Sequence, residues 1–301
     1  MKESGMRRHC GLNALVRLFH TGLCSAILST LLWKETGLRW ALVEINDLVY
    51  GAVFLCLFVT SLTLYYIACL TDPGYVSIKQ YKHNSGQVNL DFDADAELSE
   101  EEPESGGTEC SIPLTDLSQP SDKKNRYKYR FCDYCEIQPP LRSKHCEDCK
   151  NCIRKYDHHC PWLETCVGER NHRYFWWFLF TTAVLILWTF VIIWESFITE
   201  NTWADWFHTN LVLFLDTVVL VISGPVVVGL LIFHTYLMAY GLTTWEVASR
   251  ERITYLKYLD DEYNPFDQGC CKNIYYFMCI RKVQKWETLY AKRAKFKDSD
   301  V

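Results

Sequence analysis

The segment between Cys132 and Cys166 gathers the side chains of this sequence that could do chemistry. It contains seven cysteines and three histidines, the residue types that structural zinc prefers, and Cys132-x-x-Cys135 and Cys146-x-x-Cys149 have the spacing of zinc knuckles. The ten groups are Cys132, Cys135, His145, Cys146, Cys149, Cys152, His158, His159, Cys160 and Cys166. A structural zinc ion takes four ligands in a closed tetrahedron. We therefore predict two structural zinc ions, with two of the ten groups left over.

The leftover pair is expected to be one cysteine and one histidine, close to the run Asp157-His158-His159-Cys160. A histidine beside a free cysteine can take the thiol proton and produce a nucleophilic thiolate. An aspartate can hold that histidine in the required tautomer. Spacing alone leaves the assignment open: either histidine could bind metal, and Cys160 and Cys166 could exchange roles. Catalysis by the zinc ions themselves is disfavoured, because sites rich in thiolates are electron-rich and weak Lewis acids.

Four long apolar runs must position this segment, at residues 11–33, 47–70, 174–197 and 211–240. Each reaches the roughly 20 residues that a helix needs to cross a bilayer. The first run carries Arg17 and His20, so a cleaved signal peptide is an alternative, but no A-x-A-like cleavage site follows it. The predicted fold class is an all-α membrane protein with four transmembrane helices. A cysteine-rich two-zinc domain of short strands and loops, residues 122–173, is expected between the second and third helices.

Charge predicts the orientation of these helices. The segment 198–210 has no Lys or Arg, whereas the middle of the chain and the tail 241–301 are rich in both. The positive-inside rule then places the segments 1–10, 71–173 and 241–301 in the cytosol and the loops 34–46 and 198–210 in the lumen. A reducing cytosol favours metal binding by the cysteines over disulfides. Residues 71–121 read as an acidic, disordered linker, and binding of nucleic acid is not expected between two membrane helices.

With its surrounding cysteine pattern, Asp157-His158-His159-Cys160 resembles the signature of the DHHC family of protein S-palmitoyltransferases. Three further motifs extend the resemblance over nearly the whole chain. Asp72-Pro73-Gly74 is similar to the family's D-P-G motif, residues 243–246 (T-T-W-E) to its T-T-x-E motif, and Asn264-Pro265-Phe266 to its C-terminal aromatic-containing motif. The short chain, with D-P-G-Y-V, C-V-G-E-R-N-H and T-T-W-E, looks most like one short vertebrate member.

The resemblance implies a role for each group. One zinc would be held by Cys132, Cys135, His145 and Cys152, and the other by Cys146, Cys149, His159 and Cys166. Asp157, His158 and Cys160 would be catalytic, with Trp162, Phe175 and Phe178 in an acyl pocket and Thr244 and Asn264 in support. The family reaction passes an acyl chain from palmitoyl-CoA through acyl-Cys160 to cysteines of membrane-associated proteins. The expected location is a Golgi or endoplasmic reticulum membrane. Many members have two asparagines where this chain has Glu164 and Thr165, so we expect altered local hydrogen bonding there.

A non-enzymatic membrane adaptor, or a RING-like ligase scaffold, is the alternative class of function. The spare Cys–His pair and the D-P-G and T-T-x-E motifs argue against both. Two further features suggest modification and partners. Cys270 and Cys271 lie in a basic, membrane-proximal stretch and are candidates for acylation. The terminal Ser299-Asp300-Val301 has the form of a PDZ-domain ligand.

Overall fold

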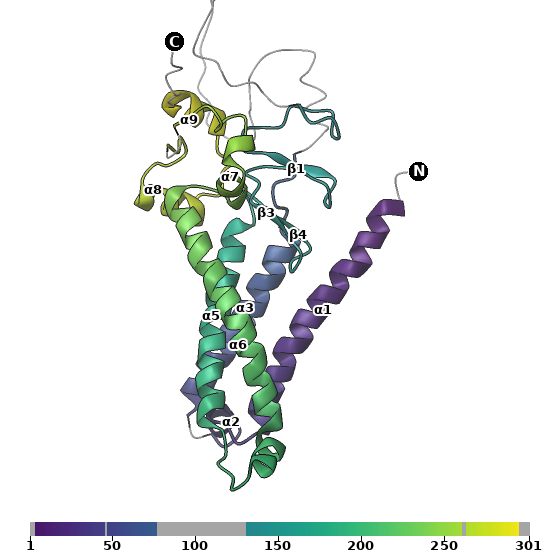
Figure 1. Ribbon diagram of the computed structural model, residues 1–301, viewed down its shortest axis with the longest axis vertical. Helices are drawn as coiled ribbons and strands as arrows, with labels where there is room; N and C mark the ends of the chain where they lie inside the picture. The colour runs from purple at the N-terminus through teal and green to yellow at the C-terminus, as the bar shows by residue number, and fades with distance from the viewer. Residues whose placement is uncertain (1–3, 46, 77–130, 261–262, 295–301) are drawn as a thin grey trace, which may run out of the picture.

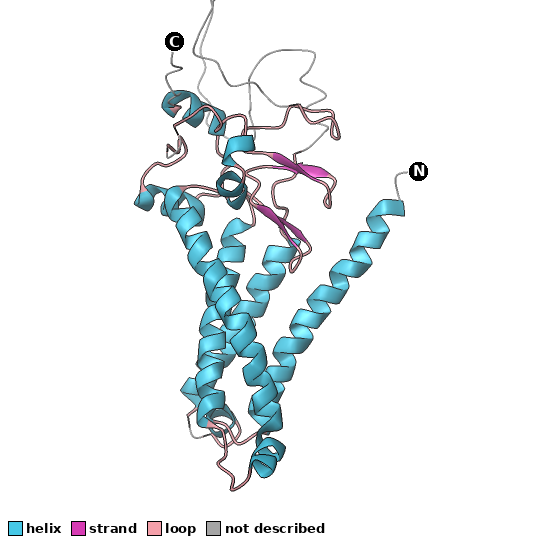
Figure 2. Cartoon of the chain, in the orientation of Figure 1, coloured by secondary structure: helices cyan, strands magenta, loops and turns pink. Residues whose placement is uncertain are grey.

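The computed structural model describes residues 4–45, 47–76, 131–260 and 263–294. Long helices form one end of the molecule, and a small module with short strands sits with the C-terminal tail at the other end (Figures 1 and 2). The described helices are α1 (Ser4–Trp33), α2 (Gly37–Leu42), α3 (Leu48–Leu70), α5 (His172–Glu195), α6 (Trp203–Tyr240), α7 (Thr244–Ala248), the 3-10 helix η1 (Arg250–Arg252), α8 (Cys270–Met278) and α9 (Trp286–Arg293). The strands are β1 (Lys144–Cys146), β2 (Asn151–Ile153), β3 (His158–Cys160) and β4 (Thr165–Val167).

Four of these helices are long and apolar enough to cross a membrane, namely Ala14–Trp33 within α1, α3, α5 and α6. Helix α5 packs against both α3 and α6, while the N-terminal part of α1 leans away from the other three (Figure 1). The predicted fold class, a four-helix membrane protein with a cysteine-rich module, is confirmed. The chain is a multi-pass membrane protein.

Several helix boundaries differ from those expected. Helix α6 begins at Trp203, because the Thr202 hydroxyl accepts a hydrogen bond from the Asp205 backbone N–H at 3.1 Å and caps the helix. Most of the expected loop 198–210 is therefore helical, and the short helix α2 occupies part of the expected loop 34–46. Helices α1 and α5 also begin earlier than predicted, at Ser4 and His172. Most of the linker expected over 71–121, and the terminal Ser299-Asp300-Val301, lie outside the described residues.

The D-P-G motif attaches α3 to the module. One oxygen of the Asp72 carboxylate accepts hydrogen bonds from the backbone N–H groups of Gly74 and Tyr75, both at 2.8 Å, which turns the chain. The other oxygen pairs with Arg170 at 2.7 Å. Gly74 has φ +110°, a conformation that only glycine adopts easily, and its carbonyl accepts from Arg154 N–H. The motif thus fixes where the module begins relative to the membrane helices.

The T-T-W-E motif attaches α6 to the same module. Thr243 and Glu246 form a capping box that starts α7, and the Glu246 carboxylate pairs with both Nε (2.7 Å) and Nη2 (2.5 Å) of Arg142. Both side chains of this ion pair are 1% exposed. Arg142 also lies over the ring of Phe266, which follows Asn264-Pro265. Asn264 itself donates to the Tyr240 carbonyl at the end of α6, so the tail is tied to the helix and the module together.

Candidate active site

The structure brings eight of the ten predicted ligand groups together in two sets of four. Cys132, Cys135, His145 and Cys152 form one set, and Cys146, Cys149, His159 and Cys166 form the other. In the first set the sulfurs lie 3.2–4.0 Å from Nδ1 of its histidine, and in the second 3.5–3.7 Å. A tetrahedral zinc with its usual Zn–S and Zn–N bonds of about 2.3 and 2.0 Å separates sulfur from nitrogen by about 3.5 Å. Both sets therefore fit a structural zinc ion.

Strand alternation explains why neighbouring residues belong to different sets. The antiparallel pair β1–β2 places His145 opposite Cys152, and β3–β4 places His159 opposite Cys166. Successive side chains on a strand point to opposite faces, so Cys146 turns away from its neighbour His145. For the same reason His158 and Cys160 share the face of β3 that points away from His159. The hairpin thus decides between the assignments that the spacing left open. His159 and Cys166 belong to a four-ligand set, and His158 and Cys160 are the two groups outside both sets.

The Asp157 carboxylate is the most constrained group beside these two. Its side chain is fully buried, and its Oδ2 lies 2.7 Å from His158 Nδ1. Thr244 donates from its backbone N–H to Oδ1 at 2.9 Å and from its hydroxyl to Oδ2 at 2.8 Å. Burial alone would raise the pKa of this carboxyl, but the histidines around it hold the pKa below its usual range. Asp157 is therefore a carboxylate that holds His158 through Nδ1 and leaves Nε2 for another partner.

That partner is Cys160. Burial opposes the protonated form of His158, yet its hydrogen bonds to Asp157 and Cys160 raise the pKa of His158 to about 9. Burial also works against the Cys160 thiolate, but the hydrogen bond from His158 and the backbone N–H groups of Leu163 and Trp162 lower the pKa of the thiol. The thiolate form of Cys160 is therefore stabilised. The arrangement is that of a nucleophile, its base and the group that orients the base.

Two histidines that the sequence analysis did not place in the site complete the surroundings of Asp157. His172, at the start of α5, has Nδ1 3.8 Å from Asp157 Oδ1 and Nε2 2.9 Å from Nδ1 of His234 on α6. The His234 ring also lies 5.7 Å from that of His158. No periodicity or spacing joins positions 62 residues apart, so only the packing of α5 against α6 reveals this pair.

The residues expected to line an acyl pocket lie on the membrane side of Cys160. Phe175 and Phe178 are buried in one cluster with Cys160, Tyr65 and Leu163. The Phe175 ring is 5.5 Å from His158, and the Phe178 ring is 5.3 Å from Tyr65. Trp162 is 40% exposed and packs its ring against Phe19 and His20 of α1. The thiol therefore opens toward an aromatic region between the helices.

Comparison with known proteins agrees with this geometry. The sequence model described as DHHC palmitoyltransferase matches residues 125–251. Human palmitoyltransferase ZDHHC12 is 36% identical over 278 residues, which are 92% of this chain and 92% of that protein. The chain belongs to the DHHC palmitoyltransferase family.

The chain is also similar to DHHC relatives from another vertebrate and from a plant. Zebrafish palmitoyltransferase ZDHHC12-A is 37% identical over 277 residues, 92% of this chain and 93% of that protein. Protein S-acyltransferase 10 of Arabidopsis thaliana is 31% identical over 251 residues, 78% of this chain and 72% of that protein. The predicted family is confirmed, and so is the likeness to a short vertebrate DHHC member. The chain resembles these relatives over both its membrane helices and its module.

Proposed function

We propose that this protein is a protein S-acyltransferase that moves a long acyl chain from palmitoyl-CoA to cysteines of membrane-associated proteins through an acyl-Cys160 intermediate. The single observation that carries this proposal is the placement of Cys160, His158 and Asp157 outside two complete four-ligand sets, at the membrane side of the module. A non-enzymatic zinc adaptor or a ligase scaffold would not need a thiolate and its base beside a membrane-facing aromatic cluster.

In the first half-reaction, the Cys160 sulfur attacks the thioester carbonyl of the acyl donor, and His158 takes the thiol proton. The carbonyl oxygen becomes an oxyanion, whose collapse breaks the bond to the CoA sulfur. His158 then gives its proton to the departing CoA thiolate, and the acyl chain stays on Cys160 as a thioester. The carboxylate of Asp157 stabilises the protonated imidazole during both steps.

In the second half-reaction, the same groups act in the reverse order. A substrate cysteine gives its thiol proton to His158, and its sulfur attacks the acyl-Cys160 carbonyl. Cys160 leaves as a thiolate and recovers its proton from His158. Each half-reaction exchanges one thioester for another, so the transfer needs no further energy source.

The membrane environment suits the acyl chain. Each buried methylene contributes about 0.8 kcal/mol to membrane partitioning, so a palmitoyl chain resides among hydrocarbon and not in water. The buried aromatic cluster of Tyr65, Phe175 and Phe178 next to Cys160 supports a path for the chain between α3 and α5, with Trp162 at its rim. Bound zinc would have a structural role, closing the loops that carry β1 to β4.

The orientation, location and partners follow from the same proposal. The charge pattern supports placing the module and both chain termini in the cytosol, and the family supports a Golgi or endoplasmic reticulum membrane. Ser299-Asp300-Val301 is proposed as a ligand for a PDZ domain.

Incubating the purified full-length protein with labelled palmitoyl-CoA tests the proposal. We expect a protein-bound label that hydroxylamine releases, as a thioester requires, and no such label on Cys160→Ser. Cys56→Ser, which changes an exposed cysteine on α3, is the matched control and should label like the wild type. If Cys160→Ser acquired the label at the wild-type rate, Cys160 could not be the nucleophile.

A further inference from the structure

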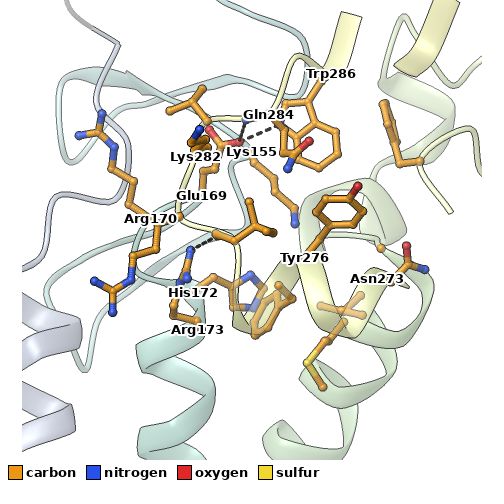
Figure 3. A pocket seen from close by; sticks show the side chains of 18 of the residues that line it. Lys155, Glu169, Arg170, His172, Arg173, Asn273, Tyr276, Lys282, Gln284 and Trp286 are labelled. Atoms are coloured by element: carbon orange, nitrogen blue, oxygen red, sulfur yellow. Dashed lines mark hydrogen bonds between the residues drawn. The ribbon is translucent and has the colours of Figure 1, made fainter. Parts of the chain in front are cut away.

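A cavity of about 230 Å³ lies between the membrane helices and the tail, and it is lined by His172, whose Nδ1 is 3.8 Å from Asp157 Oδ1. The N-terminal end of α5 and the C-terminal end of α6 form one wall of the cavity, and α8 with the segment 280–286 forms the other. Figure 3 shows His172 and Arg173 at the cavity from α5, Lys155 from the module, and Asn273, Tyr276 and Trp286 from the tail. None of the residues assigned to the reaction above lines this cavity.

Positive charge dominates the lining. Five basic side chains face one acidic side chain, Glu169, and the five are Lys155, Arg170, Arg173, Arg281 and Lys282. Glu169 is already engaged, since it pairs with Arg154 at 2.8 Å and accepts from Trp286 Nε1 at 2.9 Å. Arg170 is neutralised by Asp72. The other four cations have no carboxylate partner among the residues that the structure describes, so the cavity has a net positive charge.

Lys155 is the cation set deepest in this lining. It is partly buried, and its ammonium lies 5.3 Å from the ring of Trp286 and 5.9 Å from that of Phe277. Burial, together with the nearby charge of Arg142, lowers the pKa of Lys155 to about 8, because the carboxylates around it offset the loss of water only in part. An anionic ligand in the cavity would supply the missing partner.

Arg173 and the helix α5 add to the same preference. The Arg173 guanidinium donates to the carbonyl oxygens of Met278 (3.3 Å) and Ile280 (2.6 Å), which holds the tail segment over the first turn of α5. Carbonyl oxygens leave the cationic charge uncompensated. The N-terminus of α5 contributes a further partial positive charge at this place.

Part of the remaining lining is apolar. Leu237 and Met238 come from the last turn of α6, and Phe277, Ile280 and Val283 come from the tail. A cavity lined by both cations and apolar side chains, at the ends of membrane helices, matches an amphiphile with a phosphorylated head. We propose that this cavity binds the phosphate groups of an anionic lipid headgroup, of the phosphoinositide type, from the leaflet that faces the module.

Such a lipid would touch the active site through two residues. Lys155 precedes Asp157 by two positions, and His172 lines the cavity while its Nδ1 lies 3.8 Å from the Asp157 carboxylate. Occupancy is therefore expected to change the rate of Cys160 acylation. The preference for this leaflet rests on the cytosolic orientation proposed above, because cytosolic leaflets carry the anionic lipids.

The test uses the full-length protein in nanodiscs of neutral phosphatidylcholine, with and without phosphatidylinositol 4,5-bisphosphate. Native mass spectrometry would count retained lipids, and the acyl-enzyme assay would follow activity in the same samples. Near a membrane surface each basic residue contributes about 1 kcal/mol to binding of anionic lipid. We therefore expect the double variant Arg281→Gln/Lys282→Gln to bind this lipid roughly 30-fold more weakly. Lys285→Gln removes an equal type of charge three residues beyond Lys282, outside the cavity, and should retain most of the wild-type affinity.

Three further arms decide the source and the class of ligand. Soluble inositol 1,4,5-trisphosphate should compete, but more weakly than the lipid, because it lacks the apolar contacts. Equal binding of phosphatidylserine would overturn the proposal, since it would indicate attraction by surface charge alone. Displacement of the lipid by CoA would overturn it as well, because the cavity would then belong to the acyl donor. Failure of the wild-type protein to retain this lipid, with normal acyl-enzyme formation, would reject this site while leaving the proposed reaction intact.

Discussion

Thr244 offers a sharp test of how the site is held together. Its hydroxyl donates to Asp157 Oδ2 at 2.8 Å, and its backbone N–H donates to Oδ1 at 2.9 Å. Thr244→Val keeps the side-chain shape and the backbone bond but removes the hydroxyl donor. A hydrogen bond to a charged group contributes about 1.5–3 kcal/mol. If the whole loss fell on the transition state, acylation would slow by about 10- to 150-fold.

The lower end of this range is expected, because the carboxylate keeps its bonds to the Thr244 N–H and to His158. The measurement is the single-turnover rate of acyl-Cys160 formation, with zinc content determined on the same sample. We expect an approximately tenfold slower rate with unchanged zinc, and recovery in Thr244→Ser, which restores the hydroxyl.

Thr63→Val is the matched control, because the Thr63 hydroxyl donates only to the Val59 carbonyl within α3. A rate for Thr244→Val within about twofold of the wild type, with full zinc, would refute the idea that this bond sets the geometry of the base. Loss of zinc in the same variant would point to unfolding of the module instead of a positioning effect.

Other changes address the zinc sites and the attachments of the module. Cys149→Ser should release metal and unfold the module, because zinc binding supplies its folding free energy; metal analysis and limited proteolysis would show whether one site or both are lost. Glu246→Ala leaves the buried Arg142 charge without a partner and should destabilise the protein by about 3–5 kcal/mol, measured as a lower thermal unfolding temperature in detergent. Gly168→Ala would place a methyl group 2.5 Å from the Pro73 carbonyl and should cost about 1–3 kcal/mol; unchanged unfolding would mean that the D-P-G turn adapts freely.

Much of the architecture was predictable, because the membrane restricts it. Four apolar runs of sufficient length can only be helices in hydrocarbon, and their existence does not depend on tertiary detail. Their ends do depend on local contacts. The extra turns of α6 before residue 211 come from the Thr202 cap, a polar signal that hydrophobicity does not register. The tail's attachment was visible only as motifs, because the buried pair of Arg142 and Glu246 joins positions 104 residues apart.

The count of ligand groups limited the chemistry of the site more than any single motif did. Ten groups and two tetrahedral ions leave two groups free, but a count cannot say which two. The missing information was the strand register, since it decides which face each residue takes. Counting ligand groups could not predict that His172 and His234 lie near Asp157, because their positions depend on how α5 and α6 pack.

The β3–β4 hairpin also explains how one short sequence supports two kinds of chemistry. His159 is paired across the hairpin with Cys166, and both point toward the metal set. Fixing that face of β3 also fixes the opposite face, where His158 and Cys160 stand two residues apart. A one-residue slip in register would exchange the faces and send the nucleophile to the metal. In the proposed reaction, a zinc ion held on one face would therefore position His158 and Cys160 without taking part, and the adjacent histidines must keep their separate roles for the thiolate to remain free.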